Sequence, residues 1–186
     1  MNPYVILVAG WVVYFALHSL LATDQIKSKF SRRAFRIFYV LFSTVGLLAL
    51  LFYSSSIESL RFFMTVRWLS ALFTIFGVMV IQTSFRQYSL RGFLGLTIES
   101  GELQTHGVLQ YIRHPIQAGI ILIVIGLFIL IPNLPTLISC LCILVYIPIG
   151  LYFEEKKLIK MYGDQYVEYR KRVPAIIPNR LLKAIS

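Results

Sequence analysis

The feature that most constrains this chain is a run of about forty residues, 115–153, that carries no charged side chain. A polar, glycine-containing segment, 101–114, leads directly into this run, and two adjacent carboxylates, Glu154 and Glu155, close it. Ionisable side chains at the ends of a membrane hairpin are costly unless they bind something. The arrangement therefore predicts a ligand site at one face of a membrane.

The composition supports a membrane protein. Hydrophobic residues make up 58% of the chain and charged residues 14%, whereas soluble domains are about one quarter charged. Three further charge-free windows, 4–23, 37–57 and 68–85, are each near the roughly 20 residues that span a bilayer as a helix. The run 115–153 is about twice that length, and its Pro-Asn-Leu-Pro sequence at 132–135 must divide it into two helices.

We therefore expect an all-α integral membrane protein that forms a single domain over residues 1–186. A polar cytoplasmic linker should join the third and fourth helices, and the cytoplasmic tail, 154–186, should contain an amphipathic helix. The fourth helix is short for a full span. The five expected transmembrane helices cover residues 4–22, 37–55, 68–85, 116–131 and 136–153.

The basic residues predict the orientation. Sixteen of the eighteen lysines and arginines fall on one predicted side, and only Arg61 and Arg67 fall on the other. The positive-inside rule places the N-terminus outside and the C-terminus in the cytoplasm. The net charge of +10 is then explained by topology and attraction to anionic lipid, with no nucleic-acid partner. Cys140 and Cys142, two apart on one expected helix, are too few for a metal site, and none is expected.

Three places carry candidate chemistry. Pro115 is expected to start the fourth helix, which leaves Arg113 and His114 at a terminus suited to a carboxylate or phosphate. Alternatively, Arg113 marks the membrane interface and His114 caps a backbone group. Glu154 and its neighbour oppose the dipole of the fifth helix, so we expect a cationic partner, either the following lysines or a ligand.

His18 lies deep in the first helix, about four residues from its cytoplasmic end. An imidazole at this depth must point into the bundle, where it either forms an interhelical hydrogen bond or serves a substrate as a base. The sequence leaves both roles open.

Two blocks of the sequence resemble a known superfamily. Residues 107–115, GVLQYIRHP, look like the G-x-Y-x-x-x-R-H-P block of the isoprenylcysteine carboxyl methyltransferase and phospholipid methyltransferase superfamily. Residues 154–178 resemble its E-E…[FY]-G-x-x-Y-x-x-Y…V-P ending. The first helix, around His18, is similar to that of bacterial relatives, the NnrU-like proteins and methanethiol S-methyltransferases.

The resemblance implies S-adenosylmethionine (AdoMet) bound in a non-Rossmann pocket on the cytoplasmic side. The candidate catalytic residues are Arg113 and His18, the latter as a base for a thiol acceptor. The candidate cofactor-binding residues are Leu103, Gln104, Tyr111, His114, Pro115 and Glu154.

The chain departs from the family pattern at three positions. Leu109 and Gln117 stand where the family has tyrosines, and Gly150 stands where eukaryotic members have an arginine for the prenylcysteine carboxylate. The missing arginine weakens a prenylcysteine carboxylate as the substrate.

The expected function is AdoMet-dependent methyl transfer to a lipophilic carboxylate or thiol, either a small molecule or a prenylated acceptor. The expected location is the plasma membrane of a bacterium or archaeon. Two alternatives remain: an NADPH-dependent membrane reductase of the sterol-reductase type, and a non-catalytic membrane protein with the same fold.

Overall fold

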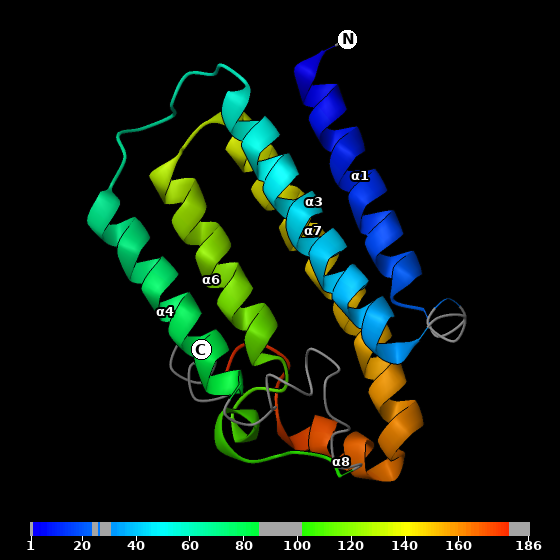
Figure 1. Cartoon of the computed structure of the whole chain (residues 1–186). Coiled ribbons are helices and arrows are strands. Elements are labelled where there is room, and N and C mark those ends of the chain that lie inside the picture. The colour runs from blue at the N-terminus through cyan, green and yellow to red at the C-terminus, as the bar shows by residue number, and fades with distance from the viewer. Residues whose placement is uncertain (1, 24–25, 27–30, 86–101, 179–186) are drawn as a thin grey trace.

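The computed structural model describes residues 2–23, 26, 31–85 and 102–178, and their regular structure is helical (Figure 1). Apart from one isolated bridge between Arg61 and Asn133, these residues form no β pairing. The elements are α1 (Pro3–Leu21), α3 (Arg32–Ser56), α4 (Arg67–Phe85), the 3₁₀ turn η1 (Gly107–Gln110), α6 (Pro115–Leu130), α7 (Leu134–Tyr162) and α8 (Asp164–Arg172).

Four helices, α1, α3, α4 and α7, are long and apolar enough to cross a membrane. The predicted all-helical membrane architecture is therefore confirmed. The fourth predicted helix, 116–131, is present as α6, which has only 16 residues, so a count of five spans stays a prediction. Residues 86–101 of the predicted linker and 179–186 of the tail lie outside the described residues.

Helix starts follow local capping rules. Asn2 accepts a hydrogen bond from the Tyr4 amide at 2.9 Å, and Asn133 accepts one from the Thr136 amide at 3.0 Å. In both helices a proline follows the cap within the first turn, where its missing N–H costs nothing. The predicted break at 132–135 is confirmed, because α6 ends at Leu130 and α7 begins at Leu134.

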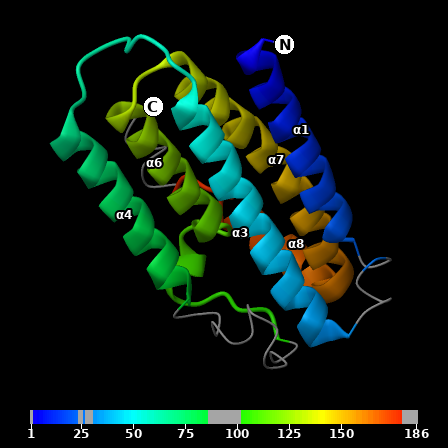
Figure 2. The ribbon, with the colours of Figure 1, turned by 45° about the horizontal axis from the view of Figure 1, so that its top comes forward.

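The helices α4 and α6 pack side by side at one edge of the bundle (Figure 2). A Cβ atom added to Gly77 would lie 2.6 Å from the Gly119 carbonyl, and one added to Gly126 would lie 2.5 Å from Thr74 Oγ1. Ser70 Oγ donates a hydrogen bond to the Gly126 carbonyl at 2.8 Å. Small residues thus allow the close backbone approach that associates helices in a membrane.

The other helices, α1, α3 and α7, meet through aromatic and polar side chains. Trp11 is fully buried, and its Nε1 donates to Ser139 Oγ at 3.1 Å. The rings of Phe15 and Tyr146 stack with centroids 4.0 Å apart. These contacts hold α1 against α7.

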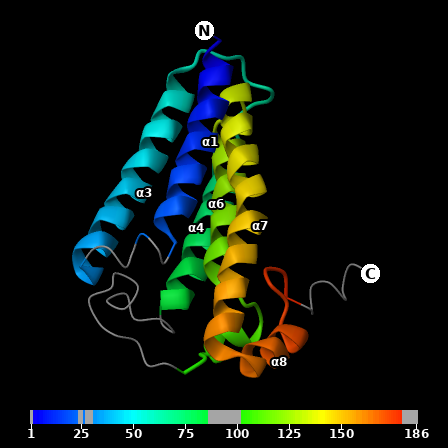
Figure 3. The ribbon, with the colours of Figure 1, turned by 90° about the vertical axis from the view of Figure 1, so that its right-hand side faces the viewer.

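The tail, in which an amphipathic helix is expected from Glu154, is divided between the end of α7 and α8. Nothing in the sequence stops α7 at Phe153, so it continues for more than two turns to Tyr162. Gly163 then adopts a positive φ of 56°, a conformation that favours glycine, and the chain turns into α8. Figure 3 shows α8 folded across the end of the bundle opposite the N-terminus.

Candidate functional site

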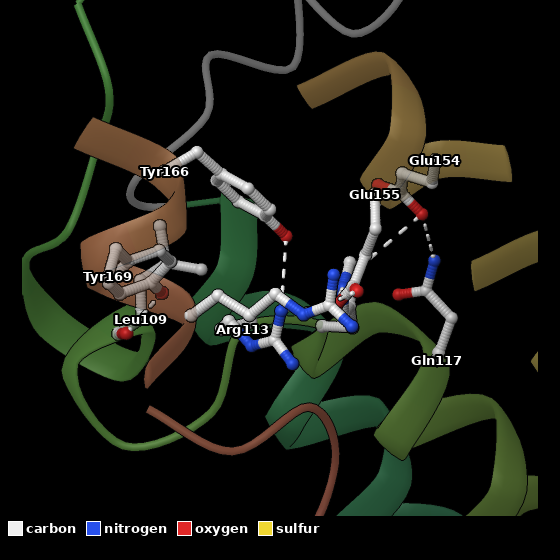
Figure 4. Close-up of polar contacts among 9 residues, drawn as sticks. Leu109, Arg113, Gln117, Glu154, Glu155, Tyr166 and Tyr169 are labelled. Atoms are coloured by element: carbon white, nitrogen blue, oxygen red, sulfur yellow. Dashed lines mark hydrogen bonds and ion pairs between the residues drawn. The ribbon is translucent and has the colours of Figure 1, made fainter. Parts of the chain in front are cut away.

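The charged end of the bundle is built from the start of α6, the last turns of α7 and the short α8 (Figure 4). Pro115 is the first residue of α6 and is buried. His114 precedes it as the N-cap residue, with φ −125° and ψ 67°, and its side chain makes no capping hydrogen bond. The alternative that the His114 side chain caps a backbone group is therefore wrong.

The tail closes over this helix start through backbone hydrogen bonds. The Arg113 amide donates to the Pro174 carbonyl, and the His114 amide donates to the Ala175 carbonyl, both at 2.9 Å. Because these amides are satisfied by the chain itself, both side chains are held at a fixed place.

Glu155 is the centre of the charge network. Its carboxylate pairs with Arg113, lies 3.2 Å from His114 Nε2 and lies 3.3 Å from Arg170 Nε. The side chains of Glu155 and Arg113 are only 14% and 8% exposed. Charges this far from water persist only when paired. The predicted cationic partner of the acids thus comes from the segment just before α6 and from α8, and not from the adjacent lysines.

Glu154 lies in a different environment. Its side chain is 46% exposed, its Oε2 accepts a hydrogen bond from Gln117 Nε2 at 2.8 Å, and it lies 3.7 Å from His114 Nδ1. Gln117, at a position where the family pattern has a tyrosine, therefore makes a polar contact to the acid. Glu154 is the acid that has accessible oxygen for a ligand.

The Arg113 guanidinium has one hydrogen-bond donor that no described residue uses. Its Nε is buried and, in the described part of the chain, has no hydrogen-bond partner. Its Nη1 lies 3.4 Å from the Tyr166 hydroxyl. Burial and the nearby Glu155 carboxylate raise the pKa of Tyr166 above its ordinary value, although Arg113 acts against them. The phenol is therefore a neutral hydrogen-bonding group at physiological pH.

The segment before α6 is held by the tail. Leu103 packs against the buried cluster of Tyr166, Tyr169 and Val173. The Tyr169 hydroxyl donates to the carbonyl of Leu109 at 2.5 Å. Leu109, at a family tyrosine position, is itself buried.

The structure thus brings together four of the candidate residues: Arg113, His114, Pro115 and Glu154. Gln104 is half-buried in the same segment as Leu103, whereas Tyr111 is 51% exposed. Because the Tyr111 side chain is so exposed to solvent, it contributes little to enclosing a pocket.

His18 belongs to a second polar cluster, inside the bundle. Its Nδ1 lies 3.0 Å from Ser43 Oγ and its Nε2 lies 2.8 Å from the Tyr39 hydroxyl. Nearby, Ser19 Oγ lies 2.8 Å from the Tyr146 hydroxyl. Among the described residues, no hydrogen bond or ion pair joins this cluster to the charged end. His18 is therefore not part of the Glu155 network.

Sequence reasoning missed the central role of Glu155 and the partners Arg170, Tyr166 and Tyr39. For Tyr39 the sequence did carry a signal, because a tyrosine hydroxyl within a membrane span needs a hydrogen-bond partner. The pairing of Arg170 on α8 with Glu155 on α7 had no local signal.

Comparison with known proteins identifies the class. The family model described as phospholipid methyltransferase matches residues 65–165, which include the whole of α4, α6 and α7. The chain belongs to this family, which makes it a membrane methyltransferase by class.

Among named relatives, the chain is similar to a methanethiol S-methyltransferase of Crocosphaera subtropica, with 28% identity over 91% of the chain and 72% of the relative. A protein-S-isoprenylcysteine O-methyltransferase of Schizosaccharomyces pombe is 35% identical over 41% of the chain and 33% of the relative. Methanethiol S-methyltransferase 2 of Bradyrhizobium diazoefficiens is 31% identical over 61% of the chain and 44% of the relative. The chain thus spans less than half the length of the last two. No solved structure matches the chain.

Proposed function

We propose that this protein transfers a methyl group from AdoMet to a lipophilic thiol or carboxylate at the cytoplasmic face of the membrane. The observation that carries the proposal is the cluster of Arg113, His114 and Glu154 at one end of the bundle, beside the buried Glu155. The family membership and the names of the relatives agree with it.

The residues at this end fit the chemical groups of AdoMet. The unpaired Nε of Arg113 can donate to a carboxylate. The half-exposed Glu154 can accept from ribose hydroxyls or an ammonium group. Leu103 can provide an apolar wall beside the tail. When bound, AdoMet supplies an electrophilic methyl group on a sulfonium.

The chain's own residues then act mainly by positioning. Methyl transfer needs an in-line approach of the acceptor, and holding the reactants at close range supplies much of the acceleration. The Glu155 carboxylate, itself paired with Arg170, keeps Arg113 and His114 in place. The burial of Arg113 and Glu155 strengthens the contact between them.

For the acceptor, we favour a thiol over a prenylcysteine carboxylate. Gly150 carries no side chain where the eukaryotic enzymes have an arginine, and a Cβ there would meet only Tyr146, at 4.0 Å. A carboxylate would therefore lack a cation at this position. A thiol must lose its proton, and we propose His18 as the base. The Tyr39 and Ser43 hydroxyls would then orient its ring.

We also propose that α6 is a fifth, short membrane segment within one domain of 186 residues. It lies between α4 and α7 in every view (Figures 1 and 2). The N-terminus would be outside and α8 cytoplasmic, in the plasma membrane of a bacterium or archaeon. Reporter fusions after Ser186 that are active only outside the cell would contradict this orientation.

Binding to detergent-purified protein tests the proposed function against a reductase and a non-catalytic scaffold. We expect saturable binding of AdoMet and none of NADPH. A second step supplies radiolabelled AdoMet with methanethiol or a prenylcysteine acceptor, and the thiol should be the better substrate. NADPH binding would favour the reductase, and binding of neither would favour the scaffold.

A further inference from the structure

A second binding feature lies at the opposite end of the bundle, on the connection between α3 and α4. This connection, residues 57–66, is fixed to the α6–α7 turn. The Phe62 amide donates to the Pro132 carbonyl at 2.6 Å, and Thr65 Oγ1 donates to the Leu130 carbonyl at 3.0 Å. A bridge between Arg61 and Asn133 adds a third attachment. The connection is therefore a fixed platform.

The platform carries a wide, open hollow of about 670 Å³ at its surface, with a cationic and apolar lining: Arg61, Phe63, Met64, Thr65 and Arg67. Thr65 orients Arg61, since Arg61 Nη1 donates to Thr65 Oγ1 at 2.6 Å. Arg67 has no ion-pair partner among the described residues. The segment's acid, Glu58, does not line the hollow.

Large apolar side chains surround these two arginines. Leu60, Met64 and Trp68 are 89%, 88% and 71% exposed. Apolar groups this open are stable where they enter a membrane interface, and aromatic rings favour that level. Arginine at the same level can keep its stem in the apolar layer while its head reaches phosphate.

We propose that the hollow between Arg61 and Arg67 binds the headgroup phosphate of an anionic phospholipid. Two guanidinium groups match the charge and geometry of a phosphate, and the exposed apolar side chains would contact the acyl chains. These arginines are the two basic residues on the predicted outer side, so the positive-inside rule does not account for them. The site lies at the other end of the bundle from Glu154, so its lipid is not the methyl acceptor.

Tryptophan fluorescence offers a direct test, because the chain has two tryptophans. Trp68 is exposed beside the hollow, whereas Trp11 is fully buried. The full chain is reconstituted in vesicles that contain brominated phosphatidylglycerol or brominated phosphatidylcholine at equal mole fraction. A Trp68→Phe variant defines the signal of Trp68.

We expect stronger quenching of Trp68 by phosphatidylglycerol. The relative association of this lipid should fall about fivefold for Arg61→Gln and again for Arg67→Gln, the equivalent of about 1 kcal/mol per basic residue near a membrane surface. Lys160→Gln, which removes the same charge from an exposed position on α7, should leave the quenching unchanged.

Three results would overturn the proposal. The first is equal quenching by both lipids in the unaltered protein. The second is a preference for phosphatidylglycerol that survives in the Arg61→Gln/Arg67→Gln double variant. The third is loss of the preference on adding inorganic phosphate at matched ionic strength, which would mean that the hollow takes a soluble anion. Unchanged Trp11 emission in each variant would show that the bundle is intact.

Discussion

The two polar clusters of this protein use the same kinds of side chain in opposite ways. At the charged end, the Glu155 carboxylate contacts both Arg113 and His114. Glu154 and the Nε of Arg113 can each form further hydrogen bonds. Inside the bundle, both ring nitrogens of His18 already have hydroxyl partners. The first cluster therefore has hydrogen-bonding capacity open to a ligand at the partly exposed Glu154, whereas the Arg113 Nε is itself buried.

The difference follows from where each cluster lies. Charged side chains cost less free energy at the charged end, because Glu154 is partly exposed to water and the tail covers Glu155. The His18 cluster sits between α1, α3 and α7 and contains only neutral groups besides the imidazole. In a membrane interior, hydroxyl and imidazole groups cost less to bury than ions. We infer that donor binding belongs to the first cluster and that any role of the second concerns the acceptor.

The largest effect should come from breaking the buried ion pair. Arg113→Ala leaves Glu155 with weaker compensation, so the free energy of unfolding should fall by about 3–5 kcal/mol. The matched control is Lys171→Ala, which breaks an exposed pair with Glu168 and should cost about 0–1 kcal/mol. Denaturant unfolding in detergent measures both. Similar losses of unfolding free energy in the two variants would show that the Glu155 network stabilises the fold no more than an exposed ion pair does.

The next effect concerns His18. If it serves as a base, His18→Ala should lower turnover with a thiol by about 100-fold while AdoMet affinity stays within about twofold. Tyr39→Phe keeps the ring and removes one hydroxyl contact, so it should cost only about 0.6 kcal/mol of stability. Steady-state rates and calorimetry on the same preparations separate these effects. A His18→Ala protein that is less stable but has full specific activity would assign His18 to interhelical bonding.

A smaller effect is expected from the tail contact. Tyr169→Phe removes the hydrogen bond to the Leu109 carbonyl, which should cost about 1 kcal/mol of stability. The same change should weaken AdoMet binding slightly, since this bond holds the segment that contains Leu103. Tyr162→Phe, on a half-buried neighbour of the same cluster, is the control and should change neither quantity.

The smallest effect is a pH dependence. Because the folded-state pKa of Tyr166 is raised above 10.0, the folded chain holds this proton where the unfolded chain releases it. This contribution to stability is complete below about pH 10 and is lost as the pH rises through the folded-state pKa. Tyr166→Phe should lack that loss. Unfolding curves at a series of pH values compare the two, and parallel slopes above pH 10 would contradict the assignment.

The sequence predicted much of the fold because membrane helices have strong local signals. Charge-free windows located the spans, and the two prolines of 132–135 located the break between α6 and α7. The end of α7 was missed, since hydropathy falls at Glu154 although the helix continues until Gly163. Hydropathy reports the edge of the apolar layer, and helix termination depends on backbone conformation.

The site was predicted only in part for a related reason. The motif and the two acids pointed to His114 and Glu154, and the structure brings these residues together. The choice between the two acids depended on which one α8 covers. The contacts of Arg170 with Glu155, and of Pro174 with the Arg113 amide, join segments far apart in the sequence. No local pattern encodes such contacts.

The most direct test of this account is the affinity of the purified protein for AdoMet, measured by calorimetry. His114→Ala and Glu154→Gln should each weaken binding by about 1–3 kcal/mol, the scale of a lost hydrogen bond to a charged group. Glu168→Gln, an exposed acid on α8, should bind like the unaltered protein. If both site variants keep full affinity while their folds are intact, the donor does not bind at the charged end and the central claim is wrong.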